Sequence, residues 1–276
     1  MGTSTLTTDH PAWRTLDDGR TVRQAGTDSG PWSATWDGAA LALVPMAGAI
    51  GPRPVVTVTR AEELSDDVPA ALREALDGLG EVHRLSNPWL WDAITSAMLR
   101  QIVQAAHARA LFERWCSAVG SPLPVLPGAL RPVPDPRTVL GLSDAEFTGV
   151  GARLHRSGLR AAARAYLHEG ASWERLAPAD LADALLKVER IGPWTARTAA
   201  ADFTGDYSIY PHGDLAVRTW ASKAAPDVAW HTTDREFCAA WRAMARTPRE
   251  LHALTLLTLT WGNHAAGKDH HAQHAA

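Results

Sequence analysis

The feature that most constrains the fold is a change of hydrophobic period near residue 68. Beyond it, apolar residues recur every three or four positions through successive segments, a spacing that gathers them on one face of an α-helix. Before it, VVTVT alternates with a period of two, and the runs WSATW and AALALV are joined by Asp37-Gly38, a pair suited to a tight hairpin turn. The sequence therefore predicts a mostly α-helical protein with a small α/β part at its N-terminus.

These signals divide the chain into three parts. We expect a small α/β domain over residues 1–82, whose first thirty residues are polar and irregular, and an all-helical domain over 83–266. The histidine-rich tail, 267–276, is expected to be flexible. Several helix starts carry a capping box, in which a Ser or Thr and a Glu three residues later satisfy free N–H groups. The pairs are Ser143 with Glu146, Thr233 with Glu236, and Thr247 with Glu250.

Composition excludes several classes of protein. No run of eighteen apolar residues is present, so no membrane span is expected, and the N-terminus lacks the basic start and apolar run of a signal peptide. A cytoplasmic location is the expectation. The two cysteines, Cys116 and Cys238, are too few for an iron–sulfur cluster or a four-cysteine zinc site. We therefore expect no metal centre built from cysteine.

The charge distribution is more informative than the net charge of −3, which gives no overall basic character. Arginines recur at spacings of three or four within GARLHRSGLRAAARA, so they share one face of a helix. They are Arg153, Arg156, Arg160 and Arg164. Such a face is either solvated or binds an anion, and the pattern alone leaves both interpretations open.

Two segments carry candidate functional groups. In IYPHGDLAVRTW a helix is expected to begin at Asp214, whose carboxylate would accept the free N–H groups of the first turn as an ordinary cap. In LLKVERIGPWTARTAAADF one helix ends near Val188, and a second begins at Trp194 or Thr195 after a short turn that contains Gly192. The N–H groups and dipole of that second helix favour a bound phosphate, and glycine permits close approach. An ordinary helical turn is the alternative.

Together these segments resemble the helix-hairpin-helix DNA glycosylase superfamily. Its hairpin reads roughly Pro-Gly-Ile-Gly-x-x-Thr-Ala and is followed by a catalytic aspartate in a Pro-x-x-Asp-Leu-x-x-Arg setting, which match residues 190–196 and 211–218. In NPWLWDAITSAMLRQIVQAA the chain also resembles the family's helix that ends in a Gln-x-Val loop. The resemblance covers about residues 84–265 and looks closest to the bacterial 3-methyladenine DNA glycosylase II group, which has a small α/β domain in front.

The resemblance implies an enzyme that flips a damaged base out of DNA and cleaves its N-glycosidic bond. Asp214 would be the catalytic carboxylate, which stabilises positive charge on the sugar and orients or deprotonates a water. Ile102, after Gln101, would wedge into the space that the base leaves, with a core isoleucine as the alternative. Two other classes stay open: a non-catalytic DNA-binding module, and a hydrolase of free nucleosides.

Trp194 stands where relatives such as endonuclease III carry a lysine that forms a Schiff base with the sugar. The resemblance therefore implies a monofunctional glycosylase, in which water attacks and the DNA strand stays uncut. The indole is also a candidate wall of the base pocket, where it would stack on a flipped base and attract a cationic alkylated base. Helix packing is its alternative role. Trp89 and Trp91 are further pocket candidates, for which core packing is the commoner role.

The expected partner is double-stranded DNA containing a damaged, alkylated base, bound by a monomer of a bacterial protein. Residues expected to contact DNA are Gln101, Ile102, Arg156, Arg190, Ile191, Gly192, Thr195 and Arg218. Arg190 replaces the first glycine of the family hairpin, and its guanidinium could contact a phosphate itself. No cofactor is expected beyond a structural monovalent or divalent cation that the hairpin could hold. The sequence leaves the lesion open.

Overall fold

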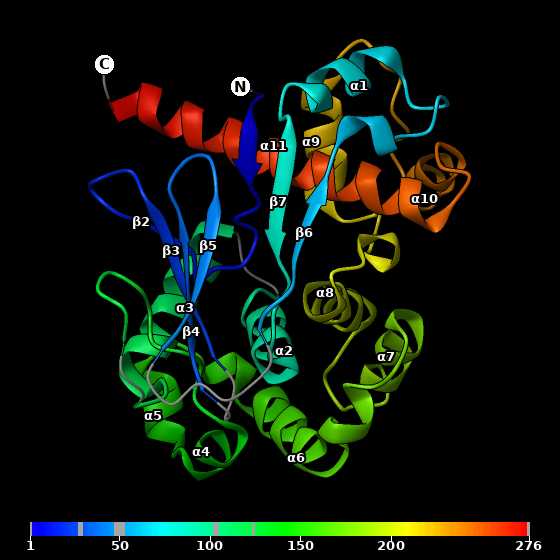
Figure 1. Ribbon diagram of the computed structural model, residues 1–276. Helices are drawn as coiled ribbons and strands as arrows, with labels where there is room; N and C mark the ends of the chain where they lie inside the picture. Colours follow the sequence, from blue (N-terminus) through cyan, green and yellow to red (C-terminus); the bar gives the residue numbers. More distant parts are fainter. Residues whose placement is uncertain (1, 27–29, 47–52, 102–104, 123–124, 275–276) are drawn as a thin grey trace.

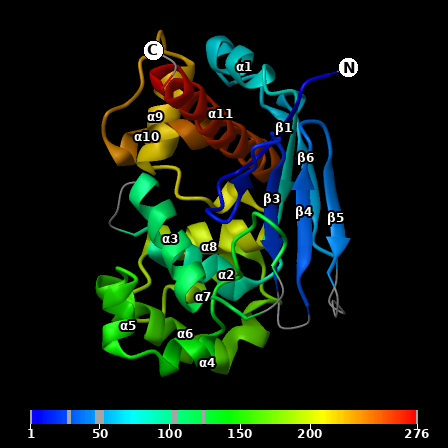
Figure 2. The ribbon, with the colours of Figure 1, turned by 90° about the vertical axis from the view of Figure 1, so that its left-hand side faces the viewer.

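Two small β-sheets lie along one side of a helical body in the computed structural model (Figures 1 and 2). The structure describes residues 2–26, 30–46, 53–101, 105–122 and 125–274. The larger sheet is antiparallel, in the order β2-β3-β4-β5. Its strands are β2 (Arg14–Thr15), β3 (Thr21–Ala25), β4 (Trp32–Trp36) and β5 (Leu41–Pro45).

The predicted hairpin is confirmed by the pairing of β4 with β5, in which Trp36 lies opposite Leu41. Asp37 closes the turn, because its Oδ1 accepts the N–H groups of Ala39 at 2.9 Å and Ala40 at 2.8 Å. Gly38 takes a φ of 101°, a left-handed value that favours glycine. The turn is thus fixed by local chemistry that the sequence displays.

The smaller sheet has the order β1-β7-β6, with β1 (Ser4–Leu6) parallel and β6 (Val56–Thr59) antiparallel to β7 (Glu81–Leu85). The expectation of an irregular N-terminus was wrong, because β1, β2 and β3 all lie within the first thirty residues. Strand β3 was not predicted, because it buries polar side chains and so lacks the alternation of apolar and polar residues that indicates a strand. Its Arg23 pairs with the Asp92 carboxylate at 3.2 Å. In addition, β7 spans the domain boundary expected at residue 82.

Helices make up the rest of the chain, and α11 continues through most of the tail that was expected to be flexible. They are α1 (Ala70–Asp77), α2 (Leu90–Leu99), α3 (Ala105–Val119), α4 (Pro136–Gly141), α5 (Asp144–Gly149), α6 (Arg156–Trp173), α7 (Pro178–Leu185), α8 (Pro193–Thr204), α9 (Leu215–Ala224), α10 (Asp234–Ala243) and α11 (Pro248–His274), with short 3-10 turns η1 (Ala61–Glu63), η2 (Arg153–His155) and η3 (Tyr207–Ile209). No helix in the described part of the chain is long and apolar enough to cross a membrane.

The three predicted caps are present, because each Ser or Thr hydroxyl accepts the N–H of its Glu partner. At α5 and α11 the glutamate also accepts the backbone N–H of the capping residue. At α10 the glutamate accepts the Thr233 hydroxyl instead. Each cap of this kind stabilises its helix by about 1 kcal/mol.

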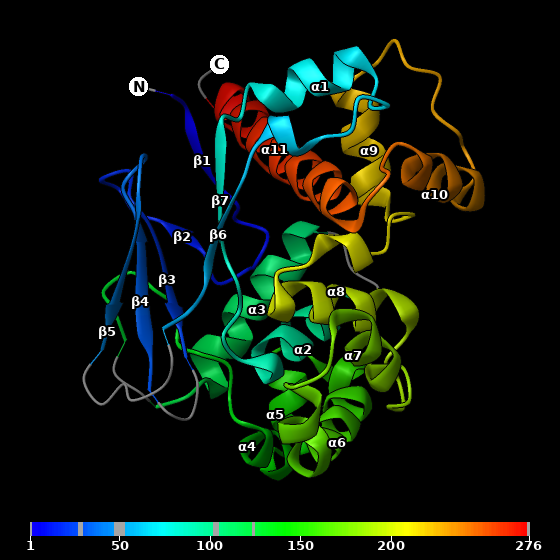
Figure 3. The ribbon, with the colours of Figure 1, turned by 45° about the vertical axis from the view of Figure 1, so that its right-hand side comes forward.

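The helices enclose two hydrophobic cores. The first surrounds α2, every residue of which is buried, and α2 packs against α3, α6 and α8. The second surrounds α11 and includes Leu72 and Leu76 of α1 together with Val217 of α9. Helix α8 and the turn η3 lie between these cores (Figure 3). The segment that follows α8 therefore runs along the junction of the two cores.

Buried ion pairs join the strands to the helical part. The guanidinium of Arg84 on β7 donates to Asp202 Oδ1 of α8 at 2.9 Å, and Arg23 on β3 pairs with Asp92 of α2. The amide of Asn87 donates to both carboxylates, at 3.1 Å and 2.9 Å. All of these side chains are buried, so removing one partner would leave a charge uncompensated.

Candidate active site

The predicted hairpin lies between α7 and α8, and its second helix begins at Pro193. Gly192 is the N-cap residue, and no side chain caps the first turn of α8. The unpaired N–H groups and the helix dipole therefore offer an anion site. A Cβ placed on Gly192 would meet no atom within 4 Å, so the approach to this helix end is open. The geometry is compatible with a bound phosphate.

Arg190 takes a φ of 70°, a left-handed conformation that glycine adopts without strain. For a residue with a Cβ this conformation costs about 1–2 kcal/mol. Its guanidinium is exposed and lies 3.5 Å from the Glu189 carboxylate. Gly158 of α6 lets the hairpin approach, because a Cβ there would lie 3.2 Å from the Arg190 Cβ. The substitution thus keeps the shape of the turn and adds a positive charge.

Asp214 is the N-cap of α9, as the sequence predicts, and its Oδ1 accepts the N–H of Ala216 at 3.2 Å. Its other oxygen has two further donors: the indole N–H of Trp194 at 3.0 Å and the hydroxyl of Tyr210 at 2.6 Å. An ordinary cap needs only the backbone contact. Three donors fix this half-buried carboxylate in place, so Asp214 is more than a helix cap.

Trp194 also has a cation on its ring. The guanidinium carbon of Arg100, at the C-terminal end of α2, lies 5.6 Å from the Trp194 ring centroid. This distance falls within the range of a cation–π contact. The attraction expected between this ring and a cationic base is therefore already supplied by the protein's own arginine.

Tyr210 rests on a second group of buried residues. Its ring stacks on Tyr207, with centroids 5.6 Å apart and planes 10° from parallel. The Tyr207 hydroxyl donates to the Asp9 carboxylate and accepts from Arg84 Nε at 3.2 Å. Burial, and next the negative charge of Asp214, raise the pKa of Tyr210 well above its ordinary value, although Arg100 acts against them. Its hydroxyl therefore remains a proton donor to Asp214 over the physiological range.

The structure brings some of the other predicted residues together. The Gln101 amide donates to the Thr195 hydroxyl, which joins the end of α2 to the start of α8. Ile102 lies outside the described residues. Ile191 is buried, so its side chain belongs to the core and only its backbone faces the turn.

The predicted arginines have partners within the protein. Arg156 and Arg160 both pair with Asp144 of α5, which neutralises part of the arginine face. Arg218 pairs with the Asp234 carboxylate at 2.8 Å and donates to the Thr232 carbonyl at 3.0 Å. These pairs reduce the number of positive charges that are free to meet DNA.

Two of the predicted pocket tryptophans are packed in the core. Trp91 has no exposed surface, and its indole N–H donates to the Pro134 carbonyl at 2.8 Å. Trp89 is buried as well. Trp91 therefore has the core-packing role that was the alternative to a place in the base pocket.

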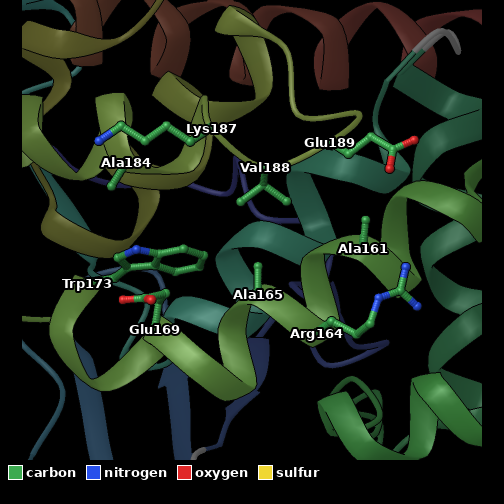
Figure 4. A pocket seen from close by; sticks show the side chains of 9 residues that line it. All are labelled: Ala161, Arg164, Ala165, Glu169, Trp173, Ala184, Lys187, Val188 and Glu189. Atoms are coloured by element: carbon green, nitrogen blue, oxygen red, sulfur yellow. The ribbon is translucent and has the colours of Figure 1, made fainter.

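A cavity of about 620 Å³ lies between α6, α7 and the turn after α7 (Figure 4). Three alanines, Val188 and Trp173 give it an apolar lining, and four charged side chains also line it: Arg164, Glu169, Lys187 and Glu189. None of the residues predicted for the site lines it, and its two carboxylates, Glu169 and Glu189, lie away from the first turn of α8 and Asp214. Size alone therefore does not make it the base pocket.

Two exposed leucines lie next to the elements that form the candidate site, and neither was predicted from the sequence. Leu154, in η2, is 75% exposed, and Leu215 directly follows Asp214 and is 68% exposed. The sequence feature that could have indicated Leu154 is its position as an isolated apolar residue inside an arginine-rich run. Among the described residues, no group of three or more His, Cys, Asp or Glu side chains is arranged to hold a metal ion.

No protein-family model and no curated protein matches this sequence. Solved structures of DNA glycosylases do match its fold. MBOgg1 in complex with a low-affinity DNA ligand has a TM-score of 0.68 at 14% identity, over 92% of this chain and 89% of that one. The 3-methyladenine DNA glycosylase of Archaeoglobus fulgidus has a TM-score of 0.67 at 15% identity, over 92% and 91%.

The 8-oxoguanine glycosylase/lyase of Clostridium acetobutylicum, in complex with DNA, has a TM-score of 0.64 at 12% identity, over 94% of this chain and 88% of that one. These likenesses extend over the strands as well as the helices. The chain has the fold of the helix-hairpin-helix DNA glycosylases, with a small α/β part in front of the helical part. The fold class predicted from the sequence is confirmed.

Proposed function

We propose that this protein is a monofunctional DNA glycosylase, which hydrolytically excises a damaged, alkylated base in base-excision repair. The observation that carries the proposal is the Asp214 carboxylate, held by Trp194 and Tyr210. Trp194 belongs to the first turn of α8, so the carboxylate is tied to the same turn that offers a phosphate site. A fixed negative charge thus lies beside the turn that we propose to bind DNA.

The chemistry follows from that placement. Cleavage of an N-glycosidic bond develops positive charge on the sugar, as in glycoside hydrolysis. A preorganised carboxylate stabilises that charge, and the oxygen of Asp214 that has only a backbone donor has room to orient or deprotonate a water. The target base must first leave the stack, because its glycosidic bond is out of reach inside the duplex.

The residues of the hairpin favour attack on the sugar by water over attack by a protein amine. An amine nucleophile is needed for a Schiff base, but the residue in the lysine position is Trp194, whose N–H is engaged by Asp214. Lys187 lies in the turn after α7 and lines the cavity there, not the Asp214 site. We therefore propose that the product is an abasic site in an uncut strand.

Duplex DNA would dock on the first turn of α8, with Arg190 and the arginines at the start of α6 contacting phosphates. The exposed Leu154 is suited to fill space between bases, as apolar side chains do in proteins that kink DNA. The protein would act as a monomer. Because much of its arginine is paired internally, binding should rely on few phosphate contacts.

The proposal is tested by incubating alkylated duplex DNA with the protein and identifying released bases by mass spectrometry. We expect released bases, alkali-labile sites and no strand break before alkali treatment. Borohydride should trap no protein–DNA adduct. Strand cleavage with a trapped adduct would contradict hydrolysis by water, and binding without release would leave a DNA-binding module.

A further inference from the structure

Arg100 is the one cation seen to cover the ring of Trp194 in the described part of the chain, and sequence patterns did not single it out. It follows directly after α2, all of whose residues are buried, so its backbone has a fixed position. Its guanidinium makes none of the side-chain hydrogen bonds found among the described residues, although it is half-buried. Those N–H donors remain available to a ligand beside the indole.

The charge of Arg100 is maintained by its surroundings. Burial by itself lowers the pKa of Arg100, but Tyr210, Asp9, Tyr207 and Asp214 outweigh it and raise the pKa above its ordinary value. Around the stacked tyrosines, Asp9 and Asp214 act on Arg100, while Arg84 also pairs with Asp202. Arg100 is the cation that lies against Trp194, so a base that carries a positive charge and stacks on that ring would meet a like charge.

We propose, resting on the glycosylase function above, that Arg100 makes the site select uncharged damaged bases and disfavour cationic ones. The first reason is the geometry of Trp194. A cationic base gains from an aromatic wall only if the ring face is free, and here one face already holds a guanidinium. A neutral base with a carbonyl or ring-nitrogen acceptor could instead accept a hydrogen bond from Arg100.

The second reason is the charge of the leaving group. When the bond between C1′ and the base nitrogen breaks, its electron pair goes to the base, and water adds to C1′ and loses a proton. A cationic base leaves as a neutral molecule, whereas a neutral base leaves as an anion unless it is protonated. Only the anion gains from a nearby guanidinium. Arg100 is therefore useful in the excision of neutral bases and unfavourable for cationic ones.

The test compares matched purines that differ in charge. Duplexes carry a single O6-methylguanine, which is neutral, or a single 7-methylguanine, which is cationic; 1,N6-ethenoadenine and 3-methyladenine form a second pair. Single-turnover release is corrected for spontaneous loss. We expect the wild type to release the neutral member of a pair faster. Arg100→Gln should lower the ratio of neutral to cationic release by about tenfold or more, the size of one cation–π contact.

Arg100→Lys keeps the charge and should hold the ratio within about threefold of wild type. Arg246→Gln, which removes an exposed arginine that pairs with Asp67, serves as the matched control. The ratio is insensitive to the fraction of folded enzyme. Preference of the wild type for cationic bases, or an unchanged ratio in Arg100→Gln, would overturn the inference alone. Absence of any base release would overturn the proposed function, and the inference with it.

Discussion

The indole N–H of Trp194 donates to the carboxylate of Asp214 at 3.0 Å, so the hairpin helix and the helix that Asp214 caps are joined by one side-chain bond. Trp194 lies on α8 and Asp214 begins α9, and the chain between them runs through η3. A group in the turn that we propose to bind DNA thereby positions the group proposed to act on the sugar. The relationship makes the orientation of the carboxylate depend on Trp194, which was expected either to form a wall of the base pocket or to pack between helices.

Substitution of Asp214 by Asn separates the cap from the charge. Asparagine caps a helix about as well as aspartate, so the free energy of unfolding should change by well under ~1 kcal/mol. Excision should fall by at least ~10²-fold, because the charge that stabilises the sugar is gone. Binding to damaged DNA should survive or tighten. A variant that melts normally and excises at near wild-type rate would return Asp214 to the role of a cap.

Trp194→Phe removes the indole N–H but keeps an aromatic ring. We expect excision to fall about tenfold or more, since a hydrogen bond to a charged group contributes about 1.5–3 kcal/mol. The melting temperature should also fall by a few degrees, because the same bond stabilises the fold. The control is Trp230→Phe, which removes the comparable bond from an indole N–H to the Ala225 carbonyl. Equal activity losses in the two variants would show that the bond to Asp214 has no special effect.

Arg190→Gly should move stability and DNA binding in opposite directions. Glycine relieves left-handed strain of about 1–2 kcal/mol, but its greater conformational freedom in the unfolded chain lowers the stability in part. We expect a net stabilisation of roughly 0.5–1 kcal/mol in urea unfolding. Loss of the guanidinium should weaken DNA binding and make the log–log salt slope shallower by about 1. Arg190→Ala, which removes the charge but not the strain, should weaken binding without the stabilisation.

Gly192→Asp places a carboxylate at the open end of α8. The backbone there, at φ −88° and ψ 172°, suits an N-cap residue, and the space is free. Stability should therefore hold or rise by a few tenths of a kcal/mol, since Asp is a better N-cap than Gly. Binding to duplex DNA should weaken for all sequences alike, because the new charge faces a phosphate. If filter binding is unchanged, DNA does not dock on this turn.

The unfolding free energy should fall as the pH drops below 7. Burial, and next the nearby Arg242 and Arg197, lower the pKa of His212 to about 4. The unfolded chain, with an ordinary histidine pKa near 6.5, then binds more protons than the native state between pH 6.5 and 4. Stability that is present above pH 6.5 is lost over that window, by about 3 kcal/mol for this residue.

Burial raises the pKa of Asp92 to about 6, which acts in the opposite direction below that pH. The measurement is therefore cleanest between pH 7 and 6, by urea unfolding of the wild type and of His212→Gln. The variant should show a smaller loss across this interval. An equal slope in both proteins would contradict the assignment to His212.

Features set by neighbours in sequence were predictable. The β4–β5 hairpin depends on Asp37 and Gly38, the helix caps depend on residues three apart, and the turn before α8 depends on the residues around Gly192. Asp214 as a cap belongs to the same class. The contact between Tyr210 and Asp214 also joins close neighbours in sequence, since Tyr210 lies four residues before Asp214. It was not predicted, because the sequence does not show where the tyrosine hydroxyl points.

Features set by tertiary packing were not predictable. Arg100 meets Trp194 only because α2 lies against α8, and Tyr207 meets Asp9 only because the N-terminal strand returns to the end of the helical part. The strand β3 was missed for the same reason, because its Arg23 is buried by a partner on a distant helix. A single sequence shows the polar residue but not the partner that lets it be buried.

The buried pairs Arg84–Asp202 and Arg23–Asp92 join the strands to the helices, so we expect that the protein cannot be divided near residue 83 without loss of stability. A fragment that began near residue 83 would lose Arg23 while retaining Asp92, and it would also lose the leucines of α1 from the core around α11. The two parts should thus melt in a single transition. The helical part contains the hairpin and Asp214, but we expect that it does not fold without the strands. The strands supply buried partners for its charged side chains.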